Sequence, residues 1–305
     1  MPRKHSPKKG TLQFWPRKRA RRIFPRIKNW PKLSKPKILG FIGYKAGMTH
    51  IQYFDNKPTS LTKNQIVTIP VTILECPPIK VNSLRFYKKT DYGIKTISEI
   101  KKSDEKIPED FDDIKLVTNT QPSLTGIGKK APEILEIALS GNKDEKLSLS
   151  KDLLGKEIKI NDVFKEGQFL DIHAVTQGKG FQGAVKRFGV KIRQHKSEKT
   201  KRGTGSLGAW TPKKVLFSVP MPGKMGFHTR TEFNKYLLKI GNDPKNINIK
   251  GGFLHYGLLK NNYILVKGSI TGPAKRPIVI TEPIRQPKKI PPLPEITYIS
   301  LESKQ

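Results

Sequence analysis

The charge of this chain constrains its structure more than any other feature, because 59 lysines and arginines face only 25 acidic residues and leave a net charge of +34. A compact protein carrying such a charge would repel itself unless a polyanion neutralised the surplus. No apolar run approaches the length that crosses a membrane, and no apolar stretch of a secretory signal follows the basic N-terminus. The sequence therefore favours nucleic acid as the partner and predicts no membrane association.

Length and cysteine content set the next limits. A chain of 305 residues has room for two or three structural units or one elaborated domain. Cys76 is the only cysteine, which excludes an internal disulfide and a zinc site built from several cysteines. It follows the apolar run "IVTIPVTILE", so we predict a core residue at the end of a strand rather than a nucleophile.

The first 37 residues are predicted to form an extended, basic, RNA-binding arm. No acidic residue precedes Asp55, whereas fifteen lysines and arginines do. Prolines recur and interrupt helix or strand formation, and Phe14, Trp15, Phe24 and Trp30 stand among the charges. Flat rings between cationic groups can stack on bases. The alternative is a disordered solubilising tail, which has no evident need for two tryptophans.

Two later segments differ sharply in charge. Fifteen acidic residues against twelve lysines and arginines lie between Glu99 and Glu166. We predict an α/β insertion there, with a strand in "APEILEIALSG" and a helix that starts near Asn142 or Asp144 and stops at Gly155. It is expected to face solvent or another protein. From Gln177 to Lys239 there are fifteen lysines and arginines against two acids, with recurring glycine, which predicts a central extension folded against nucleic acid.

The apolar runs are short, scattered and bounded by turn residues. They are "ILGFIGY", "THIQYF", "IVTIPVTILE", "IKVNSLRFY", "FLDIHAVT", "NYILVKGSI" and "PIVITEP". This pattern predicts a mainly β fold, a small β-barrel interrupted by insertions. The predicted organisation is an arm at 1–37, the first part of the barrel at 38–95, the α/β insertion at 96–166, a barrel strand at 167–177, the central extension at 178–235, the rest of the barrel at 236–285 and a proline-rich tail at 286–305.

A glycine motif raises the question of an enzyme. Residues 178–185, "GKGFQGAV", match both the kinase glycine loop and the dinucleotide fingerprint. A kinase also needs H-R-D and D-F-G motifs, and a dinucleotide site needs a helix followed by a strand that ends in an acid. Glu198 has a suitable offset, but it lies in "RQHKSEKTKRG", which cannot be a buried strand. A nucleotide-dependent or RNA-modifying enzyme is the alternative, which equilibrium dialysis against ATP and NAD tests.

The same glycines have a simpler use. A second G-x-G-x-x-G occurs in "GTGSLG", so the motif reflects glycine richness. Without a Cβ the backbone can take positive φ and approach phosphates closely. The glycines predicted to do so are Gly178, Gly180, Gly183, Gly203, Gly205 and Gly208. A third hypothesis is a free architectural chromatin protein, which co-sedimentation experiments test.

Three segments resemble the universal large-subunit ribosomal protein L-three family, in its archaeal and eukaryotic form. They are "GFIGYKAGMTHI" (40–51), "DIHAVTQGKGFQGAVKRFGVKIRQHKSEKTKRGTGSLGAWTP" (171–212) and "PGKMGFHTRTEFNKYLLKIG" (222–241). The resemblance implies a translation-protein β-barrel and a structural, non-catalytic role in the large subunit. It also implies early binding to rRNA, and an arm and central extension that run inward through that rRNA.

The resemblance places the tip of the extension, at Trp210, near the peptidyl-transferase region, and the protein near the sarcin–ricin loop and the factor-binding side. Many eukaryotic members carry histidine after this tryptophan, where this chain has Thr211. Taken from the sequence alone, Trp210 either stacks on nucleotides or packs on its own loop. Its neighbours Gly208 and Pro212 place it in a loop in both cases.

The residues predicted to contact RNA share a cationic or aromatic side chain within the arm, the extension or the adjoining strand. They are Arg3, Lys4, Trp15, Arg17, Lys18, Arg19, Arg21, Arg22, Arg26, Trp30, Lys45, Lys179, Lys186, Arg187, Lys191, Arg193, His195, Lys196, Lys199, Lys201, Arg202, Trp210, Lys213, Lys214, Lys224, His228 and Arg230. His173 is expected to be a core or interface residue. No catalytic or metal-binding residue is predicted, and no cofactor beyond Mg²⁺ associated with rRNA. The predicted partners are large-subunit rRNA and neighbouring ribosomal proteins, without homo-oligomerisation.

Overall fold

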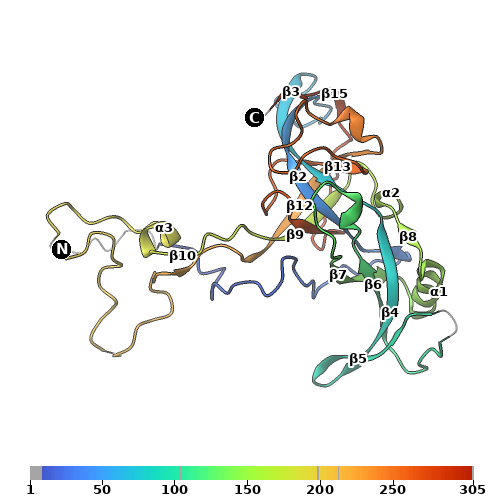
Figure 1. Ribbon diagram of the computed structural model, residues 1–305, viewed down its shortest axis with the longest axis horizontal. Helices are drawn as coiled ribbons and strands as arrows, with labels where there is room; N and C mark the ends of the chain where they lie inside the picture. The colour runs from blue at the N-terminus through green and yellow to red at the C-terminus, as the bar shows by residue number, and fades with distance from the viewer. Residues whose placement is uncertain (1–8, 103–104, 198, 212, 304–305) are drawn as a thin grey trace. The chain divides into compact units, whose positions relative to one another are not determined.

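The computed structural model describes residues 9–102, 105–197, 199–211 and 213–303 (Figure 1). Internal contacts divide the chain into two units. We call Ile23–Ala174 with Arg230–Gln305 the body, and Met1–Arg22 with Val175–Thr229 the extension unit. Arg3 and Lys4 lie outside the described residues. The division separates a part rich in regular structure from a part with very little of it.

The larger sheet of the body contains seven strands. They are β2 (Gly40–Phe54), β3 (Ile66–Glu75), β9 (Phe169–Val175), β12 (Thr229–Gly241), β13 (Tyr263–Lys267), β14 (Pro277–Thr281) and β15 (Glu295–Ile299), in the order β14-β9-β12-β13-β3-β2-β15. β14 also pairs antiparallel with β2, with Val279 opposite Ile42. This pairing turns the sheet back on itself. The mainly β fold is thus confirmed, while complete closure into a translation-protein barrel stays a prediction.

The smaller sheet holds most of the predicted insertion. Its strands are β1 (Lys37–Ile38), β4 (Ile79–Thr90), β5 (Gly93–Ile100), β6 (Asp113–Asn119), β7 (Ile134–Ser140) and β8 (Glu157–Ile158), in the order β1-β7-β6-β4-β5 with β8 on β4. The helices are α1 (Lys143–Leu153) and α2 (Ile160–Val163), and the 3₁₀ turns of the body are η1 (Pro122–Leu124) and η2 (Pro244–Asn246). An ion pair between Lys146 and Asp113, 2.7 Å long, links α1 to β6.

The ends of α1 and β7 follow the signals in the sequence. Asn142 is the N-cap of α1, and its backbone N–H donates to the Glu145 carboxylate at 2.9 Å. This hydrogen bond is one half of a capping box and satisfies a backbone donor at the start of the helix. Gly141 after β7 and Gly155 after α1 have φ values of +104° and +76°, which glycine adopts without strain. These predicted boundaries are confirmed.

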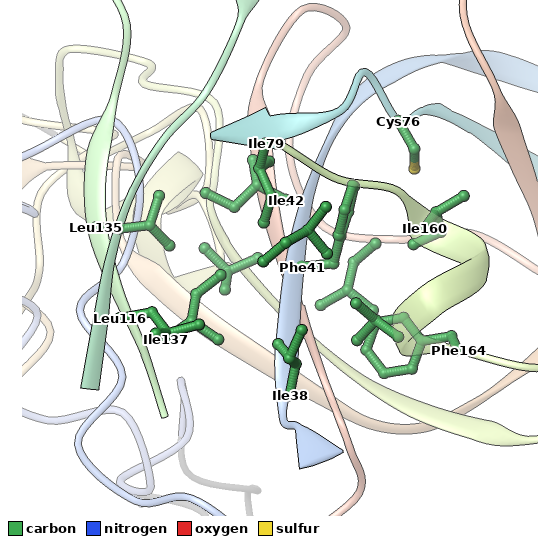
Figure 2. Close-up of a cluster of buried hydrophobic side chains, with 14 of the residues drawn as sticks. Ile38, Phe41, Ile42, Cys76, Ile79, Leu116, Leu135, Ile137, Ile160 and Phe164 are labelled. Carbon is green, nitrogen blue, oxygen red and sulfur yellow. The ribbon is translucent and has the colours of Figure 1, made fainter. Parts of the chain in front are cut away.

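The two sheets of the body share one hydrophobic core (Figure 2). Phe41 and Ile42 of β2 meet Leu116 of β6 and Ile137 of β7 in this cluster, and all four are at most 1% exposed. Cys76, directly after β3, is buried in the same core, as predicted. Its burial raises the pKa of the thiol, which removes thiolate character. A second cluster includes Tyr44, Tyr53 and Tyr263.

A buried carboxylate fastens a long loop to the body. Glu75 at the end of β3 is fully buried and accepts hydrogen bonds from the hydroxyl of Tyr256 and from the backbone N–H groups of Lys260 and Asn261, the last two at 2.8 and 2.9 Å. The side chain of Asn261 donates to the same carboxylate at 2.8 Å. A buried charge is tolerated when its hydrogen bonds are satisfied. This network therefore adds to the hydrophobic contacts that Phe253, Tyr256 and Leu259 of the same loop make in the second cluster.

The extension unit contains β10 (Phe181–Gln182), α3 (Ala184–Phe188) and β11 (Gly223–Lys224) as its regular elements among the described residues. β10 and β11 pair antiparallel, with Phe181 opposite Lys224. α3 ends at Gly189, whose φ is +68°. The remaining described residues follow long loops, as Figure 1 shows for the segment between α3 and β12. The low apolar periodicity of this segment accounts for the shortage of helices and strands.

Two isoleucines of β7 provide a matched test of the shared core. Ile137 is fully buried, whereas Ile134 on the same strand is 52% exposed. We expect Ile137→Ala to lower the free energy of unfolding by about 2–5 kcal/mol, because it removes buried methyl groups and leaves a cavity. Ile134→Ala should change it by less than about 0.5 kcal/mol. Urea unfolding measures both. Equal losses would contradict the placement of β7.

Candidate nucleic-acid interface

The second half of the predicted arm packs onto the body. Phe24, Ile27 and Trp30 are partly buried against the core shared by the two sheets. A Cβ at Gly40 would come within 2.9 Å of Cζ3 of Trp30, so glycine permits the indole to approach β2. Trp30 therefore anchors the chain to the body, and its contact with RNA stays a prediction. Arg26, in the same segment, is exposed.

The first half of the arm packs against the central extension. The rings of Trp15 and Phe188 stack with centroids 5.5 Å apart and an interplanar angle of 17°. The guanidinium of Arg17 lies 4.2 Å from the Phe188 ring centroid, and its Nη1 donates to the carbonyl of Arg187 at 3.0 Å. Aromatic stacking and cation–π contact both stabilise such a cluster. Segments about 170 residues apart in the sequence thus meet in one unit.

Two further hydrogen bonds connect residues 18–20 of the arm to the end of the central extension. The N–H of Ala20 donates to the carbonyl of Phe227 at 2.8 Å. His228 is buried, and its Nδ1 lies 2.8 Å from the carbonyl oxygen of Lys18. Nδ1 is therefore the protonated nitrogen in this hydrogen bond, because a carbonyl can only accept. The structure gives His228 a role within the protein, and contact of its ring with RNA stays a prediction.

Most of the predicted cations are exposed. The exposed set comprises Lys18, Arg19, Arg21, Arg22, Lys179, Lys186, Lys191, Arg193, His195, Lys196, Lys199, Lys201, Arg202, Lys213, Lys214 and Lys224, whereas Arg17, Arg187 and Arg230 are half-buried. Met1–Arg22 holds nine lysines and arginines and Val175–Thr229 holds twelve, while Glu198 is the only acidic residue in either range. The extension unit thus has almost no carboxylates to neutralise its own charge.

Lys45 differs from the other predicted cations because the body already holds its ammonium. Its Nζ donates to the carbonyl oxygens of Ile270 and Gly272 at 2.6 and 2.8 Å. Burial lowers the pKa of Lys45, against an opposing effect of the Glu232 charge. This geometry ties β2 to the loop before β14, and an RNA contact of Lys45 stays a prediction without support from its position.

Three of the six predicted glycines adopt conformations that favour glycine. Gly180, Gly205 and Gly208 have φ values of +67°, +93° and +137°. A Cβ at Gly180, Gly183 or Gly208 would meet no protein atom within 4 Å. The backbone at these points is consequently open on the side where a side chain would stand. Gly178 and Gly203 have neither feature: their φ values are not positive, and an added Cβ would have protein neighbours at 3.7 and 3.2 Å.

A hollow of about 300 Å³ lies in the extension unit beside these glycines. Phe181 and Phe227 line it together with Arg19 and Lys224. The guanidinium of Arg19 lies 5.5 Å from the Phe227 ring centroid, and Phe181 is 71% exposed. Rings beside cations and glycine backbone can stack a base and contact its phosphate. Sequence reasoning missed both phenylalanines, although each stands directly after a glycine.

Trp210 is 83% exposed, and the ammonium of Lys213 lies 6.0 Å from its ring centroid. The alternative in which this indole packs on its own loop is therefore wrong, because packing would hide the ring. Val215, Leu216 and Phe217 nearby are 49%, 57% and 72% exposed. Exposed apolar groups on a highly charged loop indicate a surface that a partner covers.

His173 belongs to the core, as expected. Its ring nitrogens contact Thr231 Oγ1 at 2.9 Å and Thr281 Oγ1 at 3.1 Å. Among the residues that the structure describes, no group of three or more His, Cys, Asp or Glu side chains could hold a metal ion. Within the same residues, no helix is long and apolar enough to cross a membrane.

Comparison with known proteins identifies the family. The family model described as "Ribosomal protein L3" matches residues 1–112 and 98–305. The chain belongs to the ribosomal protein L3 family. Its relatives include proteins named large ribosomal subunit protein uL3, from Methanococcus aeolicus (45% identical, covering 99% of this chain and 98% of the relative) and Methanocaldococcus jannaschii (46%, covering 98% and 97%). Membership in this family makes the chain a structural ribosomal protein and excludes the kinase and dinucleotide interpretations.

The buried position of His173 predicts a pH dependence of stability. Burial lowers the pKa of His173, against a smaller opposing effect of the Asp171 charge. The unfolded chain therefore takes up a proton at this residue at a higher pH than the folded protein, and stability is lost as the pH falls below about 6.5. We expect His173→Gln to lose less unfolding free energy than the unchanged protein between about pH 7.5 and 5.5. Urea unfolding at both pH values measures this, and equal losses would contradict it.

Proposed function

We propose that the protein is a structural constituent of the large ribosomal subunit, in the cytoplasm, that binds large-subunit rRNA and supports early subunit assembly. The observation that carries this proposal is the extension unit, with 21 lysines and arginines against one acid in its two ranges and most of the described cations exposed. Relatives that carry the large-subunit name share 45% identity over 99% of the chain. Because these relatives are named for the ribosome, RNA is the polyanion that we expect to neutralise the charge of this chain.

Each feature of the interface has a part in this binding. The exposed lysines and arginines neutralise phosphates, and the open glycine backbone at Gly180 and Gly208 permits close approach. Aromatic side chains stack on unpaired bases. The body presents the near-neutral insertion at 96–166 to neighbouring ribosomal proteins. Trp210 lies at the tip that the family resemblance places toward the peptidyl-transferase region.

The binding of purified protein to structured large-subunit rRNA should depend steeply on salt. Neutralising about ten phosphates on a duplex gives a slope of roughly −9 in a plot of log affinity against log salt concentration. The double variant Lys213→Gln, Lys214→Gln should make this slope shallower by about 1 per lost phosphate contact. Lys101 and Lys102 are exposed in the insertion, so the same two changes there provide the control and should leave the slope unchanged. An affinity that does not respond to salt would contradict the proposal.

Trp210→Ala separates an RNA contact from a structural role. The ring is 83% exposed, so the variant should change the free energy of unfolding by less than about 0.5 kcal/mol. Losing one stacked base should nevertheless weaken rRNA binding by about 1–3 kcal/mol. Tyr92→Ala is the control, because Tyr92 is fully exposed on the body hairpin between β4 and β5. Urea unfolding and filter binding measure the two effects. Equal binding by both variants would count against a contact at the tip.

A further inference from the structure

A cleft of about 240 Å³ lies on the body, and none of the residues predicted to bind RNA lines it. Its walls include Phe169 and Tyr236, whose rings meet edge to face with centroids 5.3 Å apart. The hydroxyl of Tyr236 lies 3.2 Å from the carbonyl oxygens of both Pro291 and Pro292, to which it can donate. These contacts fasten the proline-rich tail along one wall. The apolar part of the cleft is therefore formed by the protein itself, before any ligand arrives.

Two lysines stand at this cleft, and the charge of one carboxylate, Asp55, acts on both of them. Lys57 and Lys267 line it, and neither forms an ion pair with any residue that the structure describes. The ammonium of Lys267 lies 5.6 Å from the ring centroid of Tyr53, another lining residue. Burial lowers the pKa of Lys267, and the charge of Lys57 lowers it further, against an opposing effect of Asp55. An anion between the two ammonium groups would relieve their repulsion.

Asp55 is the carboxylate nearest to Lys57 in the sequence, and it accepts hydrogen bonds within its own loop. Asp55 Oδ2 accepts hydrogen bonds from Ser60 Oγ at 2.6 Å and Thr62 Oγ1 at 2.7 Å, and Oδ1 accepts one from the backbone N–H of Lys57 at 3.2 Å. These bonds hold the Asp55 carboxylate within its own loop. The third lysine at the cleft, Lys235, contacts Glu232 at 2.7 Å. Asp55 and Glu232 thus offset two of the three lysine charges at the cleft, which leaves a surplus of positive charge for a ligand.

We propose that the cleft binds one unpaired nucleotide of rRNA, with its base against the aromatic and proline walls and its phosphate at Lys57 and Lys267. The inference rests on the proposed rRNA binding and adds to it a site on the body. The volume of about 240 Å³ is below the roughly 300–1,000 Å³ typical of pockets for drug-sized ligands, which suits a single base. The apolar walls and the surplus of positive charge at Lys57 and Lys267 match the ring and the phosphate of a nucleotide. RNA is favoured over an acidic protein segment because the proposed function already brings rRNA to this protein, and a nucleotide carries an aromatic ring and an anionic phosphate together.

Ultraviolet crosslinking of assembled large subunits that contain this chain tests the inference. After digestion, mass spectrometry should find a nucleotide adduct on the peptide that carries Tyr53 or on the one that carries Tyr236. Nucleotide adducts between residues 199 and 217 would support the proposed rRNA binding of the extension unit, independently of the cleft. Adducts in that range with none at the cleft would overturn the inference alone. Absence from both regions would overturn the proposed function as well. A zero-length crosslink from Lys57 to a carboxylate of another ribosomal protein would show that a protein segment lies at the cleft, which also overturns it.

A pair of matched variants sharpens this test. Lys57→Gln removes one of the two lining lysines that form no ion pair with a described residue. Lys63→Gln removes an exposed lysine of the same loop that does not line the cleft. We expect Lys57→Gln to lower the adduct yield at the cleft at least about tenfold and to make the salt slope of rRNA binding shallower by about one. The control should change neither value. Equal adduct yields for the two variants would overturn the inference.

Discussion

Electrostatic repulsion within the extension unit is the constraint on which the rest of the structure depends. The two ranges of this unit contain 21 lysines and arginines and a single acid, so side chains of the unit cannot neutralise one another. In the body, by contrast, cations form ion pairs with carboxylates, as Arg85 does with both Glu99 and Glu136. A unit with few apolar contacts and a large uncompensated charge gains stability when a polyanion binds, because counterions are released and repulsion falls. Under the proposed function this polyanion is RNA, which would then be part of the physical account of the fold.

Packing in the body and packing in the extension unit are correspondingly different. The body buries a core shared by its two sheets, and hydrogen bonds within the protein satisfy the buried carboxylate of Glu75. The extension unit relies on a small aromatic and cationic cluster around Phe188, together with a few backbone hydrogen bonds to the arm. It leaves Trp210 and Phe217 exposed. The body can thus act as a fixed anchor, while the extension unit presents side chains whose partners come from outside the chain.

The sequence predicted what local chemistry determines. Apolar runs with turn residues between them became strands, and the caps of α1 at Asn142 and Gly155 followed from their residue types.

Contacts between distant segments could not be predicted from the sequence, because no local pattern links Trp15 to Phe188 or Lys18 to His228. The same reason explains Lys45, which resembles an RNA-binding cation in sequence and donates to two carbonyl oxygens of the body in the structure. "ILGFIGY" and "THIQYF" are one strand, β2, because its pairing with β3 continues across the shift in register between Lys45 and Gly47. The cleft between Tyr53 and the proline-rich tail had no signal in the sequence, since its lining residues come from five separate segments.

Backbone hydrogen–deuterium exchange, compared between the free protein and the assembled large subunit, tests the central claim most directly. In the free protein we expect slow exchange in the body, above all in β2, β3 and β13, and fast exchange through most of residues 9–22 and 178–229, where few backbone hydrogen bonds protect the amides. In the assembled subunit both ranges should exchange slowly, because RNA covers them. Slow exchange of the extension unit in the free protein, to the same degree as in the subunit, would show that it folds without a polyanion and would contradict the account.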